Sequence, residues 1–241
     1  MSRSPVLFLI PTPLGGSVAD SLTPEALAKI RTLRDFVAEN AKTARAFLAE
    51  VEMPCPIREL QIIEHNVRAA PEDAQALLAP MTAGRDLGLM SEAGCPAIAD
   101  PGAWVVAAAH AKQFRVEPLI GPSSLVLALM ASGLQGQRFT FHGYLPRDAA
   151  ARQHTIRQLE ARSATADETQ LFIETHYRNA ALFQALLDTC RADTRLCVAQ
   201  GLTLPDAFIQ TREINAWRQQ PVPILKQPAV FLLLARGKKS S

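Results

Sequence analysis

The stretch that decides the fold runs from Leu87 to Gly102 and reads L-G-L-M-S-E-A-G-C-P-A-I-A-D-P-G. Its first four residues predict a buried strand, the segment after them predicts a loop, and residues 103–111 predict a buried helix. Ligands of open α/β sheets bind outside the carboxyl ends of the strands. The loop is therefore a candidate ligand site, although a glycine loop alone is also typical of an ordinary strand-to-helix turn.

Strands and helices alternate on both sides of this stretch. Thr23 and Asn40 are predicted N-caps, and Pro24 suits the first position of a helix. The alternation indicates βαβ units and a parallel sheet. The predicted strands are 6–10, 35–38, 60–63, 87–90 and 115–119, and the predicted helices are 24–30, 41–51, 72–81 and 103–111.

The composition changes after Ile120, where G-P-S-S at residues 121–124 precedes an apolar helix over 125–131. We therefore expect an α/β protein of two α/β domains. Residues 1–119 form a parallel sheet with flanking helices and carry the cofactor loops, whereas residues 120–241 form a mixed sheet with helices. In the second domain, the predicted strands are 139–144, 170–173, 195–199, 208–212 and 229–235, and the predicted helices are 149–162 and 182–190.

The composition argues against several classes of protein. The chain has 25 basic and 23 acidic residues, a net charge of +2, which is too small to predict non-specific binding to a polyanion. Its four cysteines form no C-x-x-C pair and its five histidines have no ligand spacing, so we predict neither a disulfide framework nor a metal site. The apolar run 6–10 is shorter than a signal-peptide core or a membrane span. We expect a cytoplasmic protein that does not associate with membranes.

Three loops of small residues remain as the candidate binding elements, at 11–16, 91–102 and 121–124. The sequence has no phosphate-binding loop, no G-x-G-x-x-G and no G-x-S-x-G motif, which argues against common ATPases and hydrolases. Glycine and serine let backbone groups approach a ligand, and a helix N-terminus at Ser123 and Ser124 offers N–H groups to a carboxylate. A ligand with a nucleoside at one end and a carboxylate at the other fits this set of loops.

The order of motifs resembles a known family. Six segments occur along the chain in the following order: P-T-P-L-G at 11–15, E-H-N at 64–66, the loop 91–102, G-P-S-S at 121–124, F-H-G-Y-L-P-R at 141–147 and E-T-H-Y-R at 174–178. This order is similar to the tetrapyrrole-methylase superfamily of S-adenosylmethionine-dependent methyltransferases. The most similar branch is the ribosomal RNA small-subunit methyltransferase I type, which methylates the 2'-hydroxyl of a cytidine ribose.

The resemblance implies S-adenosylmethionine bound in a cleft between two α/β domains, ribosomal RNA or the small ribosomal subunit as a partner, and a homodimer. The residues that would line the cofactor site by motif are Pro13, Gly15, Ser91, Ala93, Gly94, Pro96, Asp100, Ser123 and Ser124.

Polar residues near these loops are candidates for catalysis and for substrate binding. Glu92 and Glu174 are the predicted catalytic residues, each a candidate base for a ribose hydroxyl. For both, a hydrogen bond that organises the loop is the alternative role. The predicted substrate-binding residues are His65, Asn66, Arg147 and Arg152. For His65 the alternative is a solvated or core histidine, and for the arginines it is a solvated helix face.

The chain departs from the family pattern on the substrate side. At three segments the family's motifs carry more charges or place their histidine differently. These segments are A-E-N-A-K at 38–42, E-T-H-Y-R at 174–178 and Q-G-L-T-L at 200–204. Three functions therefore stay open. The first is an RNA ribose methyltransferase, the second a methyltransferase of a small, tetrapyrrole-like molecule, and the third a non-catalytic S-adenosylmethionine-binding protein.

Overall fold

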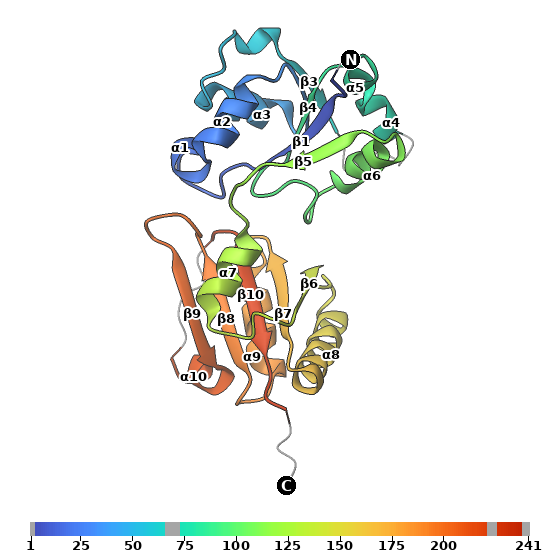
Figure 1. Cartoon of the computed structure of the whole chain (residues 1–241). Helices are drawn as coiled ribbons and strands as arrows, with labels where there is room; N and C mark the ends of the chain where they lie inside the picture. Colours follow the sequence, from blue (N-terminus) through green and yellow to red (C-terminus); the bar gives the residue numbers. More distant parts are fainter. Residues whose placement is uncertain (1–2, 66–72, 221–225, 238–241) are drawn as a thin grey trace. The chain divides into compact units, whose positions relative to one another are not determined.

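The computed structural model describes residues 3–65, 73–220 and 226–237. The chain divides into two compact units, Met1–Ser123 and Ser124–Ser241 (Figure 1). The Gly121–Ser123 turn therefore belongs to the first unit.

The first unit contains a five-stranded sheet with the strand order β3-β2-β4-β1-β5. All four strand pairs are parallel, which confirms the predicted parallel sheet. The strands are β1 (Val6–Ile10), β2 (Asp35–Ala38), β3 (Gln61–Glu64), β4 (Leu87–Met90) and β5 (Arg115–Pro118). The helices are α1 (Val18–Ser21), α2 (Pro24–Arg31), α3 (Ala41–Glu50), η1 (Ile57–Glu59), α4 (Asp73–Leu77), α5 (Ala79–Thr82) and α6 (Ala103–Ala111).

Alternate residues of β1 build two separate cores, because successive side chains of a strand point to opposite faces. Phe8 and Ile10 pack with Ile30 of α2 and Leu48 of α3. Leu7 packs on the other face, in a cluster that also holds residues of α4, α5 and α6. The sheet is thus covered by helices on both faces, as expected for parallel strands that are buried throughout.

One local prediction in this unit was wrong, and two short helices were not predicted. The predicted helix over 72–81 is broken into α4 and α5, and its predicted first residue lies outside the described residues. The break lies just before Pro80, which has no backbone N–H to continue the helix. The short helices α1 and η1 were not predicted, because four and three residues are too few to show a periodic pattern.

The second unit contains a five-stranded sheet with the order β6-β7-β10-β8-β9. Only β6 and β7 are parallel and the other three pairs are antiparallel, so the predicted mixed sheet is confirmed. The strands are β6 (Phe139–Tyr144), β7 (Thr169–Glu174), β8 (Arg195–Gln200), β9 (Phe208–Glu213) and β10 (Ala229–Leu234). The helices are α7 (Ser124–Ser132), α8 (Ala149–Ala166), α9 (Asn179–Thr189) and α10 (Ile214–Gln219).

The second sheet is also buried on both faces. Phe172 and Phe231 pack with the larger cluster, which includes Leu186 of α9 and Trp217 of α10. Leu171 and its neighbours on the opposite face pack against Ala128 of α7. In the part of the chain that is described, no helix is both long and apolar enough to span a bilayer.

Gly88 provides a test of this packing. A Cβ atom at this central position of β4 would lie 2.6 Å from Ile10 Cδ1 and 2.9 Å from Phe36 Cδ1. Gly88→Val should therefore lower the free energy of unfolding by about 1–3 kcal/mol, the usual effect of overpacking a core. Urea unfolding followed by circular dichroism measures the change. Gly136→Ala is the matched control, since a Cβ there meets nothing within 4 Å. Equal stability of the two variants would contradict the packing described.

Candidate cofactor site

The loops that follow β1 and β4 are joined by two backbone hydrogen bonds. Thr12 N donates to Gly94 O at 2.9 Å, and Gly94 N donates to Thr12 O at 3.0 Å. Gly94 has a φ of +79°, a conformation that residues with a Cβ rarely adopt. The glycine is therefore needed for the backbone to pair with Thr12.

Ser91 holds the first turn of the loop after β4. Its side chain is buried and donates to Gly94 O at 3.3 Å, while Thr12 Oγ1 donates to Ser91 O at 3.3 Å. Both neighbouring backbones are thereby fixed at the carboxyl ends of the two central strands. The structure thus places predicted cofactor residues Ser91 and Gly94 where the two loops meet.

A cavity of about 330 Å³ lies beside this junction, within the first unit. Ligand pockets are usually about 300–1,000 Å³, so a small molecule fits. The first two loops form one side, and α1, α3 and the end of β4 contribute the other lining residues. The lining includes five residues named from the sequence, Pro13, Gly15, Ser91, Glu92 and Ala93.

The third predicted loop packs against the first two. A Cβ at Gly121 would lie 2.2 Å from Pro11 Cγ, so only glycine permits this approach. The thiol of Cys95 donates to Pro122 O at 3.3 Å. All three small-residue loops therefore meet at one edge of the parallel sheet. Ser123 ends the first unit, and Ser124 is the first residue of α7.

Asp100 organises the second half of the loop after β4. Its Oδ1 accepts the backbone N–H groups of Ala97 and Gly102, both at 2.7 Å. Ala97 and Ala99 have φ values of +66° and +63°, so this segment is strained and the carboxylate helps to hold it. Burial raises the pKa of Asp100, and the two N–H groups partly oppose the rise. Asp100, predicted to line the cofactor site, thus has the loop-organising contacts of a short acid in a turn. Pro96, also predicted there, is buried in the same segment.

Glu39 was not singled out from the sequence, although it directly follows β2 at the same edge of the sheet. Its carboxylate accepts the backbone N–H of Glu92. Burial raises the pKa of Glu39, and the negative charges of Asp100 and Glu92 raise it further. Glu39 thus fixes the backbone of Glu92, whose own side chain is exposed. Its position after a strand is the signal that could have identified it.

The segment after β3 has a supporting role. His65 is only 3% exposed, and its Nε2 lies 3.2 Å from Pro101 O, so it braces the loop from beneath. Glu64 Oε1 accepts the Ala41 N–H at 2.8 Å at the start of α3. This placement gives no support to the prediction that His65 contacts the substrate. Asn66 lies outside the described residues.

The predicted residues of the second unit cluster where β6 and β7 end. The side chain of Glu174 is fully buried, and its Oε2 lies 3.0 Å from Arg178 Nη2 in an ion pair. A base must reach its substrate, so this burial favours a structural role for Glu174 over the predicted catalytic one. Arg152 Nη1 donates to Arg147 O at 3.1 Å, which holds Arg152 to the loop. The guanidinium of Arg147 is exposed and makes no hydrogen bond or ion pair to the described residues.

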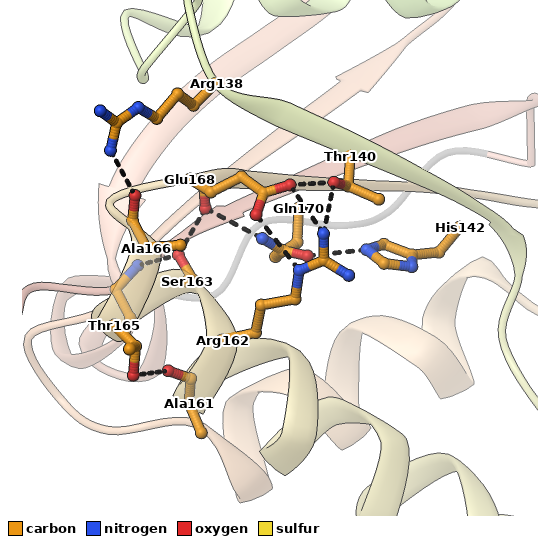
Figure 2. A network of polar contacts seen from close by, with 11 residues as sticks. Arg138, Thr140, His142, Ala161, Arg162, Ser163, Thr165, Ala166, Glu168 and Gln170 are labelled. Atoms are coloured by element: carbon orange, nitrogen blue, oxygen red, sulfur yellow. Dashed lines mark hydrogen bonds and ion pairs between the residues drawn. The ribbon is translucent and has the colours of Figure 1, made fainter.

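A polar network at the other end of β6 and β7 is structural (Figure 2). The carboxylate of Glu168 accepts from Thr140 and from Arg162, whose Nε lies 3.2 Å away. His142 Nε2 lies 2.7 Å from Gln170 Oε1, which links the two strands again. Among the described residues, no group of three potential metal ligands occurs here or elsewhere.

Comparison with known proteins relates the sequence of this chain to one family. The family model of the Tetrapyrrole (Corrin/Porphyrin) Methylases matches residues 6–215. A protein of Xylella fastidiosa (strain Temecula1) named Ribosomal RNA small subunit methyltransferase I is 36% identical over 205 residues, or 84% of this chain and 70% of that protein. The protein of the same name from Escherichia coli O157:H7 is 31% identical over 237 residues, 97% of this chain and 78% of that one.

A solved structure agrees in fold. The crystal structure of the methyltransferase CobJ superposes with a TM-score of 0.64 at 18% identity and covers 97% of this chain and 95% of its own. At that identity the likeness shows the fold alone. The family model, in contrast, matches every strand of both sheets except β10 and ends at the start of α10, and the sequence relatives extend over most of the chain. The chain therefore belongs to the tetrapyrrole methylase family of methyltransferases.

Proposed function

We propose that this chain transfers a methyl group from S-adenosylmethionine to a ribose 2'-hydroxyl of ribosomal RNA. The observation that carries the proposal is the junction of the loops after β1 and β4, with its adjoining cavity. The relatives named Ribosomal RNA small subunit methyltransferase I support the choice of RNA as acceptor.

The residues at the junction suit S-adenosylmethionine. Small side chains and glycine let a ligand approach the backbone of both loops, and the cavity of about 330 Å³ has the size of a small-molecule site. The bound cofactor supplies a methyl group on a sulfonium, which is already an activated leaving group. The protein must then hold and align the acceptor and exclude water.

Glu92 is the better placed of the two predicted bases. The acceptor hydroxyl loses its proton as its oxygen forms the bond to the methyl carbon, and a carboxylate can take that proton. Glu92 is exposed and lines the cavity, and its backbone is held by Glu39. Glu174, in contrast, is buried and paired with Arg178.

The homodimer and the association with the small ribosomal subunit that the resemblance implies are part of this proposal. Light scattering tests the first through the mass of the protein in solution. Co-sedimentation with small ribosomal subunits tests the second.

Gly94 tests cofactor binding. S-adenosylmethionine should give a binding isotherm in calorimetry, and Gly94→Val should weaken the affinity at least about tenfold, since a side chain at this positive φ distorts the pairing with Thr12. Gly84→Val is the matched control, because Gly84 has a φ of +82° and open space around it, away from the loops. Equal affinities of the two variants would show that the loop does not form the cofactor site.

The substitution Glu92→Gln tests whether Glu92 acts as the general base. The substitution keeps size and hydrogen bonding and removes basicity, so single-turnover transfer of tritiated methyl groups to RNA should slow ~10²-fold at unchanged cofactor affinity. Glu25→Gln, on the exposed first turn of α2, is the control. A Glu92→Gln rate within a few-fold of the parent would assign the residue to loop organisation. Transfer to metabolite extract in place of RNA would instead favour a small acceptor.

The raised pKa of Glu39 predicts that the stability of the protein depends on pH. Its raised pKa means that the folded protein holds this proton more tightly than the unfolded chain. The stabilising contribution is thus fully present below the ordinary value of 4.5 and is lost as pH rises through the higher folded value. Glu39→Gln should therefore melt at a higher temperature than the parent at pH 7, with no difference at pH 4. A lower melting temperature at pH 7 would mean that the charge itself stabilises the loop.

A further inference from the structure

The only two tyrosines of the chain, Tyr144 and Tyr177, are both exposed at one edge of the second sheet. Their exposed fractions are 56% and 84%. Tyr144 is the last residue of β6, and Tyr177 follows the end of β7 by three positions. Because β6 and β7 are parallel neighbours, both tyrosines lie at the carboxyl edge of this strand pair.

The loops that carry the tyrosines are tied together. Arg178 Nη2 contacts Glu174 at 3.0 Å and donates to the carbonyl oxygens of Leu145 and Pro146, both at 3.4 Å. Glu174 Oε1 also accepts the Thr175 N–H at 2.8 Å. Arg178, held by its ion pair to the buried Glu174, therefore connects the two segments.

Tyr177 has an aromatic neighbour on one side. The ring centroids of His176 and Tyr177 are 3.6 Å apart, with the planes tilted by 42°. This contact leaves most of the tyrosine ring open to solvent, as its exposed fraction shows. An exposed ring supported from one side is a surface on which a base can stack.

A positively charged side chain lies in the loop that follows Tyr144. The side chain of Arg147, three residues after Tyr144, is exposed, and its guanidinium has no hydrogen bond or ion pair within the described residues. The neighbouring acid, Asp148, is engaged in capping α8, because its Oδ1 accepts the Ala151 N–H at 2.8 Å. Exposed aromatic rings beside a free guanidinium are typical of single-stranded RNA binding, in which bases stack and phosphates meet arginine.

We propose that Tyr144 and Tyr177 form a stacking surface for unpaired bases of an RNA acceptor, with Arg147 contacting a phosphate. The inference rests on the proposed RNA methyltransferase function and adds the part of the second unit that holds the acceptor. The proposal thus adds Tyr144 and Tyr177, which the sequence analysis quoted in motifs but did not predict as substrate-binding residues, to the predicted substrate residue Arg147.

The tyrosines can be replaced without removing the main supports of the strand pair. The network of Glu168, Arg162 and Thr140 joins β6, β7 and α8 at the opposite end of the strands (Figure 2). It involves neither tyrosine. Substitutions at Tyr144 and Tyr177 are therefore expected to leave the fold intact.

Fluorescence anisotropy with a labelled ten-nucleotide oligocytidine RNA tests the proposal on the full chain. Tyr177→Ala and Tyr144→Ala should each weaken binding about 5- to 150-fold, the range found for loss of one stacked base. Tyr→Phe at either position keeps the ring and should change affinity less than about twofold. Arg147→Gln should lower the salt slope of the affinity by about one unit. Phe139→Ala is the matched control, because Phe139 is a 48% exposed aromatic at the other end of β6.

Calorimetry with S-adenosylmethionine on the same variants separates this proposal from the proposed function. Unchanged cofactor binding with selective loss of RNA binding in the two alanine variants supports the stacking surface. If both alanine variants bind RNA as tightly as the parent, the stacking surface is overturned and RNA remains the acceptor. A parent that binds the cofactor but no RNA, or binds uroporphyrin in its place, overturns both the stacking surface and the RNA acceptor.

Discussion

The two backbone hydrogen bonds between Thr12 and Gly94 are the interaction on which the candidate site depends. They join the segments that leave the central strands β1 and β4. The positions of the two loops are therefore set directly by the sheet. Backbone pairs of this kind tolerate little change, because the glycine conformation at Gly94 is closed to most side chains. The cavity beside the pair exists because both loops are held at this point.

Acidic side chains extend this constraint along the loop after β4. Asp100 binds two N–H groups of its own loop, and Glu39 binds the N–H of Glu92 from the neighbouring strand. Both carboxyl groups are partly buried, and this burial raises the pKa of each. A loop held in a costly conformation is typical of a binding site, since the surrounding structure must maintain it.

The second unit uses an ion pair for a similar purpose. Glu174 and Arg178 connect the ends of β6 and β7, where the exposed tyrosines lie. The departure of the E-T-H-Y-R segment from the family pattern is thus located in the structure at an exposed aromatic surface. The buried Glu174 of this segment maintains the loop, and the exposed Tyr177 is free to meet a partner.

The sequence by itself determined the elements and the position of the loops. The limits of β4 and α6 agree with the prediction, because an apolar run and a change of period are local properties of the chain. It also identified the three small-residue loops, in which Gly94 is required by its positive φ and Gly121 by its close approach to Pro11. Only the tertiary structure showed that Glu39 holds Glu92, that His65 braces Pro101 and that Glu174 is buried against Arg178. These roles depend on which surfaces the fold covers and, for Glu39 and His65, on partners 36 or more positions away in the chain, which no local pattern encodes.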